Sequence, residues 1–175
     1  NYLIVKAAGN DRGQGPNPGT THKAWNDATQ AWENSTMTRQ KGGGTNGFDC
    51  ISHAGVAKNV LTVGAVQGIS SGYTNPADVI ASTFHGWGPT DDGRIKPDIV
   101  AKGVGVYSST HASNSSYDPL SGTSMASPVV TGSAALLQQY VVQTLQQAPL
   151  KAATLKGLLI HTADEAGPHP GPDYM

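Results

Sequence analysis

A run of small residues leads into an apolar segment in the second half of the chain. Residues 122–128 have the sequence Gly-Thr-Ser-Met-Ala-Ser-Pro, and the mostly apolar run Val129–Val142 follows. This run predicts a buried helix from about Ser124 to Leu145, so Ser124 lies at its N-terminus. The first N–H groups of a helix have no intrahelical acceptor and can stabilise negative charge beside a hydroxyl there. Ser124 is therefore either a candidate nucleophile or an ordinary helix cap.

The string Gly122–Pro128 resembles the serine motif of the subtilisin-like serine proteases, the subtilases. Three further stretches resemble the same family in the expected order: Ala7–Asn10 after a short apolar strand, Ala57–Ala65, and Gly88–Thr90 with Arg94–Ala101. The resemblance covers nearly all of the chain except about residues 12 to 48, which we interpret as a Gly-rich insertion.

The resemblance implies an α/β fold, the subtilisin-like three-layer αβα arrangement with a mostly parallel sheet. The 175 residues, taken together, are expected to be an incomplete C-terminal part of a single catalytic domain. Within it, residues 2–6 and 60–66 have the continuous apolar pattern of buried parallel strands. Residues 104–109 predict a further short strand, residues 111–120 a polar hairpin or loop, and Pro149 opens a second amphipathic helix.

The resemblance also implies roles for individual residues. Ser124 would be the nucleophile of acyl transfer, and Asn10 would donate its side-chain amide to the oxyanion. Taken alone, the Gly9-Asn10 pair after a strand is more typical of a turn. Residues that would contact the substrate, by the same resemblance, are Ala7, Ala8, Gly9 and Thr123.

The other two members of a Ser-His-Asp triad are missing from the sequence. The family's histidine stands in a His-Gly-Thr motif, and none of the six histidines has that setting, so we expect each to be a surface or loop residue. His53, just before the 57–65 stretch, is a tempting base, and we reject it on the same ground. Asp91-Asp92-Gly93 follows no apolar strand and predicts only a turn. We therefore expect the Asp and His to lie in a missing N-terminal half, and this chain alone to be inactive.

Composition excludes several other partners. The formal net charge is −1, and the 11 Lys and Arg are scattered, which argues against nucleic-acid binding. No stretch has 18 consecutive apolar residues, so we expect no membrane span. The single cysteine, Cys50, is typical of a small buried hydrophobe. The resemblance implies a polypeptide substrate, a secreted or extracellular enzyme and no cofactor for the chemistry. Structural calcium is common in such proteins, but no stretch here has an ordered spacing of oxygen ligands.

Two other interpretations remain open at this point. A catalytically inactive binding or adhesion module built on the same fold would also keep residues 122–128. An α/β-hydrolase would need Gly-x-Ser-x-Gly, and the last glycine is absent after Ser124.

Within the insertion, residues 21–37 carry Trp25, Ala28 and Trp32 at spacings of 3 and 4, which predict a short amphipathic helix. We expect the two tryptophans to anchor this loop to the body, the alternative being that they line substrate subsites.

Overall fold

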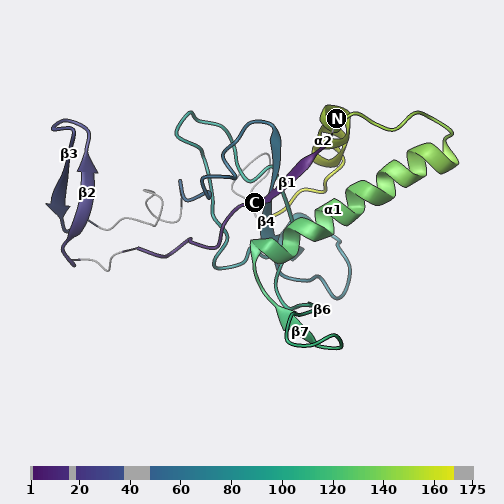
Figure 1. Cartoon of the computed structure of the whole chain (residues 1–175), viewed down its shortest axis with the longest axis horizontal. Helices are drawn as coiled ribbons and strands as arrows, with labels where there is room; N and C mark the ends of the chain where they lie inside the picture. The colour runs from purple at the N-terminus through teal and green to yellow at the C-terminus, as the bar shows by residue number, and fades with distance from the viewer. Residues whose placement is uncertain (1, 16–18, 38–47, 168–175) are drawn as a thin grey trace.

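A computed structural model describes residues 2–15, 19–37 and 48–167 (Figure 1). The Gly42–Gly47 run and His169 lie outside these residues. The elements in chain order are β1 (Ile4–Ala7), β2 (His22–Asn26), β3 (Ala31–Ser35), β4 (Val60–Val66), the 3₁₀ turn η1 (Pro76–Asp78), β5 (Ile99–Lys102), β6 (Val106–Ser109), β7 (Tyr117–Leu120), α1 (Thr123–Gln139), the π-helical turn η2 (Tyr140–Thr144) and α2 (Ala152–His161).

The central sheet has three parallel strands in the order β1-β4-β5. Ile4 pairs with Val60 at one side of β4, and Val63 pairs with Ile99 at the other. All seven residues of β4 are buried, as the continuous apolar run predicts for a strand covered on both faces. The fold class is therefore confirmed as α/β with a parallel sheet.

One face of β4 packs against α1. The side chains of Leu61, Val63 and Ala65 form the core cluster with Ala126 and Val130 of α1. Alternate residues of a strand point to the same face, so this set follows from the strand's period of two. Burying a large aliphatic side chain of this kind stabilises the fold by roughly 1.5–3 kcal/mol, so β4 and α1 supply much of the core energy.

The opposite face of β4 is covered by loop residues rather than by a helix. The gap at Gly64 accommodates His85, since an added Cβ would lie 3.2 Å from the His85 ring. Two positions earlier, Thr62 Oγ1 accepts a hydrogen bond from Lys96 Nζ at 2.9 Å, and Lys96 forms an ion pair with Asp98. The loop that spans residues 82–98 thus forms the second covering layer of the sheet.

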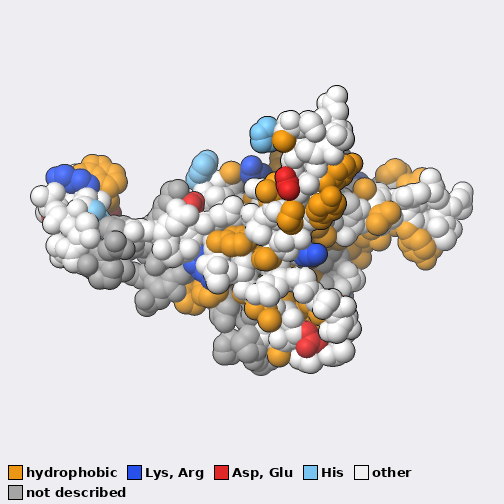
Figure 2. All heavy atoms as spheres, turned by 90° about the horizontal axis from the view of Figure 1, so that it is seen from below, with side chains coloured by type: hydrophobic (Ala, Val, Ile, Leu, Met, Phe, Trp, Pro, Cys, Tyr) orange, Lys and Arg blue, Asp and Glu red, His pale blue; other side chains and the backbone are white. Residues whose placement is uncertain are grey.

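The two predicted helices are confirmed, but α1 is less buried than expected. Only one stripe of α1 is buried, namely Thr123, Ala126, Val130 and Ala134. On its outer side Leu136 is 68% exposed and Tyr140, in η2, is 52% exposed. Figure 2 shows hydrophobic side chains at the surface on the right, where the end of α1 and η2 lie. The expectation of a buried helix is therefore wrong for most of its circumference, because the sheet covers only one of its faces.

The predicted helix over residues 21–37 is also wrong, because this segment is the antiparallel hairpin β2–β3. Trp25 pairs directly with Trp32 across the strands, and their rings meet edge to face with centroids 5.7 Å apart. The Asn26 side chain accepts a hydrogen bond from the Ala28 backbone N–H at 2.9 Å and so closes the turn. In Figure 1 the hairpin stands apart at the left, so the tryptophans contact each other rather than anchor the loop to the sheet.

The region between β5 and α1 forms a second hairpin. β6 and β7 are antiparallel, and the rings of Tyr107 and Tyr117 stack with centroids 5.8 Å apart. This confirms the predicted strand at residues 104–109. Residues 111–120, expected to form a hairpin or loop, supply the turn and the second strand of this hairpin. The predicted turn at Asp91–Gly93 is confirmed as well, with Gly93 N–H donating to Thr90 O at 2.7 Å.

Gly86 lies where two loops touch, and it offers a direct test of this packing. A Cβ added at Gly86 would collide with the carbonyl oxygen of Cys50 and lie 3.1 Å from that of Ala8. Backbone atoms cannot rotate away from the new methyl group. Gly86→Ala is therefore expected to lower the free energy of unfolding by about 1–3 kcal/mol. Urea denaturation measures the change. The matched control is Gly132→Ala in α1, where an added Cβ meets nothing within 4 Å. Equal stability of the two variants would contradict the packing described.

Candidate active site

The predicted functional residues meet at the carboxyl edge of the parallel sheet. Asn10 follows β1, and Gly103 follows β5. Gly103 N–H donates to Val66 O at 3.0 Å, and Gly122 N–H donates to Gly103 O at 2.8 Å. These bonds bring the start of α1 to the strand ends. Ligand sites of open α/β sheets gather at this edge.

Ser124 is the second residue of α1 and is exposed. Neither its hydroxyl nor its backbone N–H makes a hydrogen bond to any residue that the structure describes. Gly122 caps the helix with extended backbone and no side chain. The hydroxyl of Ser124 therefore does not cap the helix, and it lies at the positive end of the helix dipole.

The orientation of the Asn10 amide is determined by Thr123. Asn10 Oδ1 accepts hydrogen bonds from the Thr123 backbone N–H and from Thr123 Oγ1, both at 2.9 Å. A backbone N–H only donates, so the amide atom that faces it must be oxygen. The Asn10 NH₂ group therefore points away from Thr123, and an added Cβ on Gly122 would lie 3.3 Å from Nδ2. The NH₂ donor of Asn10 therefore lies next to Gly122, the residue that precedes Thr123 and Ser124.

Thr123 is itself fully buried and also accepts a hydrogen bond from Gly9 N–H at 3.2 Å. Its side chain therefore orients Asn10, and the expected contact of Thr123 with substrate stays a prediction. Ala8 is fully buried too, whereas Ala7 and Gly9 are partly exposed. Ser52 supports this segment, since its backbone N–H donates to Ala8 O at 2.7 Å.

No histidine among the described residues makes a hydrogen bond to Ser124. His53 is exposed and lines a pocket of about 460 Å³ with Asp49, Thr90 and Arg94. His85 lies in a loop, as expected, but its side chain is fully buried against β4. The unusual His-Gly-Trp-Gly-Pro string is the one sequence signal that sets His85 apart from the other histidines, and it does not predict this burial.

Two other polar groups near the sheet have structural roles. Burial raises the pKa of the Cys50 thiol, which keeps it protonated and poorly reactive. Burial likewise lowers the pKa of Lys96, and the neighbouring Asp98 carboxylate opposes that shift. Lys156 Nζ lies 3.5 Å from the other oxygen of Asp98. These charges connect β4, β5 and α2 and do not face Ser124.

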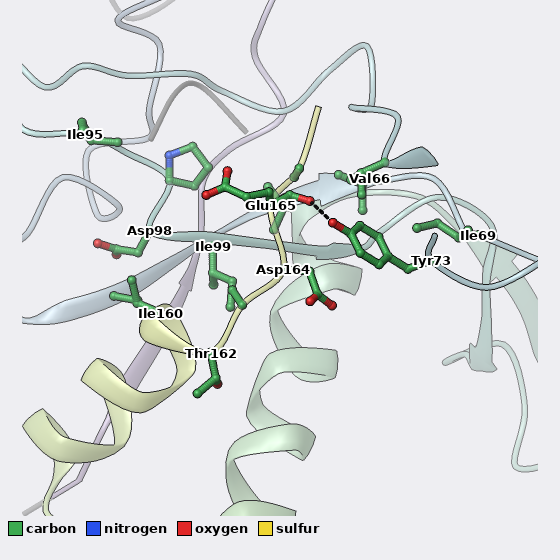
Figure 3. Close-up of a pocket in the computed structure, with 15 residues that line it drawn as sticks. Val66, Ile69, Tyr73, Ile95, Asp98, Ile99, Ile160, Thr162, Asp164 and Glu165 are labelled. Atoms are coloured by element: carbon green, nitrogen blue, oxygen red, sulfur yellow. Dashed lines mark hydrogen bonds between the residues drawn. The ribbon is translucent and has the colours of Figure 1, made fainter. Parts of the chain in front are cut away.

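A pocket of about 510 Å³ lies between β5 and the segment that follows α2 (Figure 3). Its walls include Ile99 of β5 and Ile160 of α2, and the Tyr73 hydroxyl donates to Glu165 O at 3.1 Å. Among the described residues that line it there is no serine, cysteine or histidine. The described lining of the pocket therefore holds no serine nucleophile and no histidine base.

Residues 2–15, 19–37 and 48–167 contain no group of three or more His, Cys, Asp or Glu placed to hold a metal ion. In the same ranges, no helix has the length and apolar character needed to cross a membrane.

Comparison with known proteins places the chain in a family. A model of the subtilase family, Peptidase_S8, matches residues 1–174. The chain belongs to the subtilase family.

The curated relatives of this subtilase are much longer proteins. C5a peptidase of Streptococcus pyogenes is 45% identical over 84 residues, which is 47% of this chain and 7% of that protein. Pyrolysin of Pyrococcus furiosus is 38% identical over 109 residues, 52% of this chain and 8% of that protein. Serine protease AprX of Bacillus subtilis is 38% identical over 101 residues, 51% of this chain and 22% of that protein. The subtilase chain thus corresponds to a small part of each relative.

Solved structures support the same fold. The PatG macrocyclase domain superposes with a TM-score of 0.59 at 24% identity, covering 99% of this chain and 39% of that one. The CspB protease of Clostridium perfringens superposes with a TM-score of 0.56 at 28% identity, covering 73% of this chain and 26% of that one. The αβα architecture of subtilisin-like proteases therefore accounts for the arrangement of the sheet and α1.

Proposed function

We propose that this chain supplies the nucleophile and part of the oxyanion hole of a serine endopeptidase. The observation that carries the proposal is the pair of hydrogen bonds from Thr123 to Asn10, which turn the Asn10 NH₂ group away from Thr123 and toward Gly122, the residue that caps α1. Membership of a family whose named relatives are proteases supports a polypeptide substrate.

In the proposed reaction, Ser124 Oγ attacks the carbonyl carbon of a peptide bond. A histidine base takes the hydroxyl proton as the new C–O bond forms. The Ser124 backbone N–H and the Asn10 NH₂ group donate to the oxyanion. The C–N bond then breaks, the leaving amine takes the proton from the histidine, and water hydrolyses the acyl-enzyme. Ala7 and Gly9, which are partly exposed beside Asn10, would form a wall of the substrate pocket.

We also propose that the Asp and His of the triad lie outside this chain, in the other part of a single catalytic domain. The exposed Ser124 hydroxyl and the absence of a His-Gly-Thr motif support this partition. The exposed apolar outer side of α1 and the edge of β1 that pairs with no other described strand offer surfaces on which such a part would pack. An extracellular location and structural calcium, both implied by the resemblance, belong to the same proposal.

A fluorophosphonate probe, which reacts only with an activated serine, tests the proposal. The full-length protein that contains this chain is expected to gain one adduct at Ser124, located by peptide mass mapping. The 175-residue chain alone is expected to gain none. An adduct on the isolated chain would contradict the partition of the triad, and an unlabelled full-length protein would favour an inactive module that only binds.

A further inference from the structure

The loop of residues 82–88 holds the Asn10 segment at two backbone positions. Gly86 N–H donates to Gly9 O at 3.0 Å, before Asn10, and Arg12 N–H donates to Phe84 O at 3.1 Å, after it. Asn10 therefore lies between two anchors to the same loop.

The Arg12 side chain adds a third anchor of a different kind. Its Nη2 donates to Ser82 O at 2.6 Å and its Nε to Thr83 O at 3.3 Å. The guanidinium carbon lies 3.7 Å from the centroid of the Trp87 ring. A guanidinium stacked on an indole gains a cation–π attraction, so Arg12 is held both by carbonyl oxygens and by the ring.

Trp87 in turn is oriented by the buried His85. Trp87 Nε1–H donates to His85 Nε2 at 2.9 Å, and an indole nitrogen can only donate. His85 Nε2 is therefore unprotonated and accepts, and His85 Nδ1, which carries the proton, lies 3.1 Å from Ser82 Oγ. Ser82 therefore contacts both ends of the cluster formed by Arg12, Trp87 and His85. Its carbonyl oxygen accepts from Arg12, and its hydroxyl lies within hydrogen-bond distance of His85 Nδ1.

We propose that Arg12 is a positioning residue for the Asn10 amide, held in place by Trp87 and His85. This inference rests on the proposed role of Asn10 in the oxyanion hole. An oxyanion donor contributes only if it is held in place before the reaction. Gly9 has a φ of +104°, and the segment that leads to the β2–β3 hairpin begins just after Arg12. The Arg12 cluster therefore fixes the backbone on both sides of Asn10 where the chain leaves the sheet for that hairpin.

The test uses peptide hydrolysis by the full-length protein. Arg12→Met keeps most of the length of the side chain but removes its charge and donors, and it is expected to lower kcat by about 10- to 100-fold with KM nearly unchanged. Arg12→Lys keeps the charge and is expected to recover part of that loss. The matched control is Arg94→Met, which removes a guanidinium bound to Asp92 in a surface turn and is expected to leave kcat unchanged. Wild-type kcat in Arg12→Met would overturn the inference.

A double-mutant cycle separates positioning from general damage. If Arg12 acts through Asn10, Arg12→Met is expected to cost little further kcat in an Asn10→Ala background. Fully additive losses would overturn the inference while leaving the oxyanion role of Asn10 intact. A wild-type kcat for Asn10→Ala alone would instead refute the proposed function.

His85 provides a second, independent variant. His85→Gln keeps a side-chain acceptor for the Trp87 indole N–H, whereas His85→Phe removes it. Because His85 is fully buried, thermal unfolding is measured alongside the kinetics. A larger loss of kcat in His85→Phe than in His85→Gln, beyond any difference in folded fraction, supports the cluster. Equal kcat values in the two folded variants would contradict the role assigned to His85.

Discussion

Replacing Ser124 by alanine is expected to lower kcat of the full-length protein about a million-fold, the loss known for removal of the nucleophile in subtilisin itself. The hydroxyl oxygen is the atom that forms the acyl bond, so no other group on α1 replaces it. Ser124 is exposed at the helix N-terminus, and its hydroxyl makes no hydrogen bond to a described residue, so the substitution should leave the fold intact. Peptide hydrolysis and fluorophosphonate labelling measure the effect.

The control for this prediction is Ser133→Ala. Ser133 lies on the exposed side of the same helix, and its hydroxyl donates to Val129 O at 3.1 Å. This variant is expected to keep full activity and labelling. If Ser124→Ala retained measurable labelling at another serine with wild-type kcat, Ser124 would not be the nucleophile.

Replacing Asn10 by alanine is expected to lower kcat by about 100- to 1000-fold, the range established for the equivalent type of donor in subtilisin. The amide donates to charge that exists only in the transition state, so KM is expected to change little. Asn10→Asp sharpens the test. Its carboxylate can still accept from the Thr123 backbone N–H and hydroxyl, but it presents an anion where the donor stood. Its loss of kcat is therefore expected to be at least as large.

Steady-state kinetics on a peptide substrate distinguish these effects. Asn34→Ala, on the exposed face of the β2–β3 hairpin, is the matched control and is expected to behave as wild type. An increase in KM at unchanged kcat in Asn10→Ala would show that Asn10 binds substrate without stabilising the oxyanion. That result would contradict the arrangement proposed.

The elements that can be predicted from the sequence depend on residues close together along the chain. β4 is a continuous run of apolar residues, and α1 begins after Gly122 with a proline in its first turns. Each pattern is complete within a few residues, so it does not need knowledge of the fold. The same local pattern places Ser124 at a helix N-terminus.

The helix prediction over residues 21–37 fails because a spacing of seven residues fits two structures. Trp25 and Trp32 would lie on one face of a helix two turns apart, and they also lie opposite each other in a hairpin with a short turn. The Asn26 turn decides between the two, since its side chain accepts from the Ala28 N–H. Turn chemistry therefore outweighs periodicity in this segment.

Local patterns and motifs are enough to assign the family, the parallel strands, the two helices and the position of Ser124. The orientation of Asn10, and the contacts that hold it, emerge only from long-range packing. The Thr123 contact joins residues 113 positions apart, and the cluster of Arg12, Trp87 and His85 joins segments about 70 positions apart. Hydrogen-bond direction and burial at such contacts depend on how the strands and loops pack against one another. That packing cannot be inferred from any short stretch of neighbouring residues.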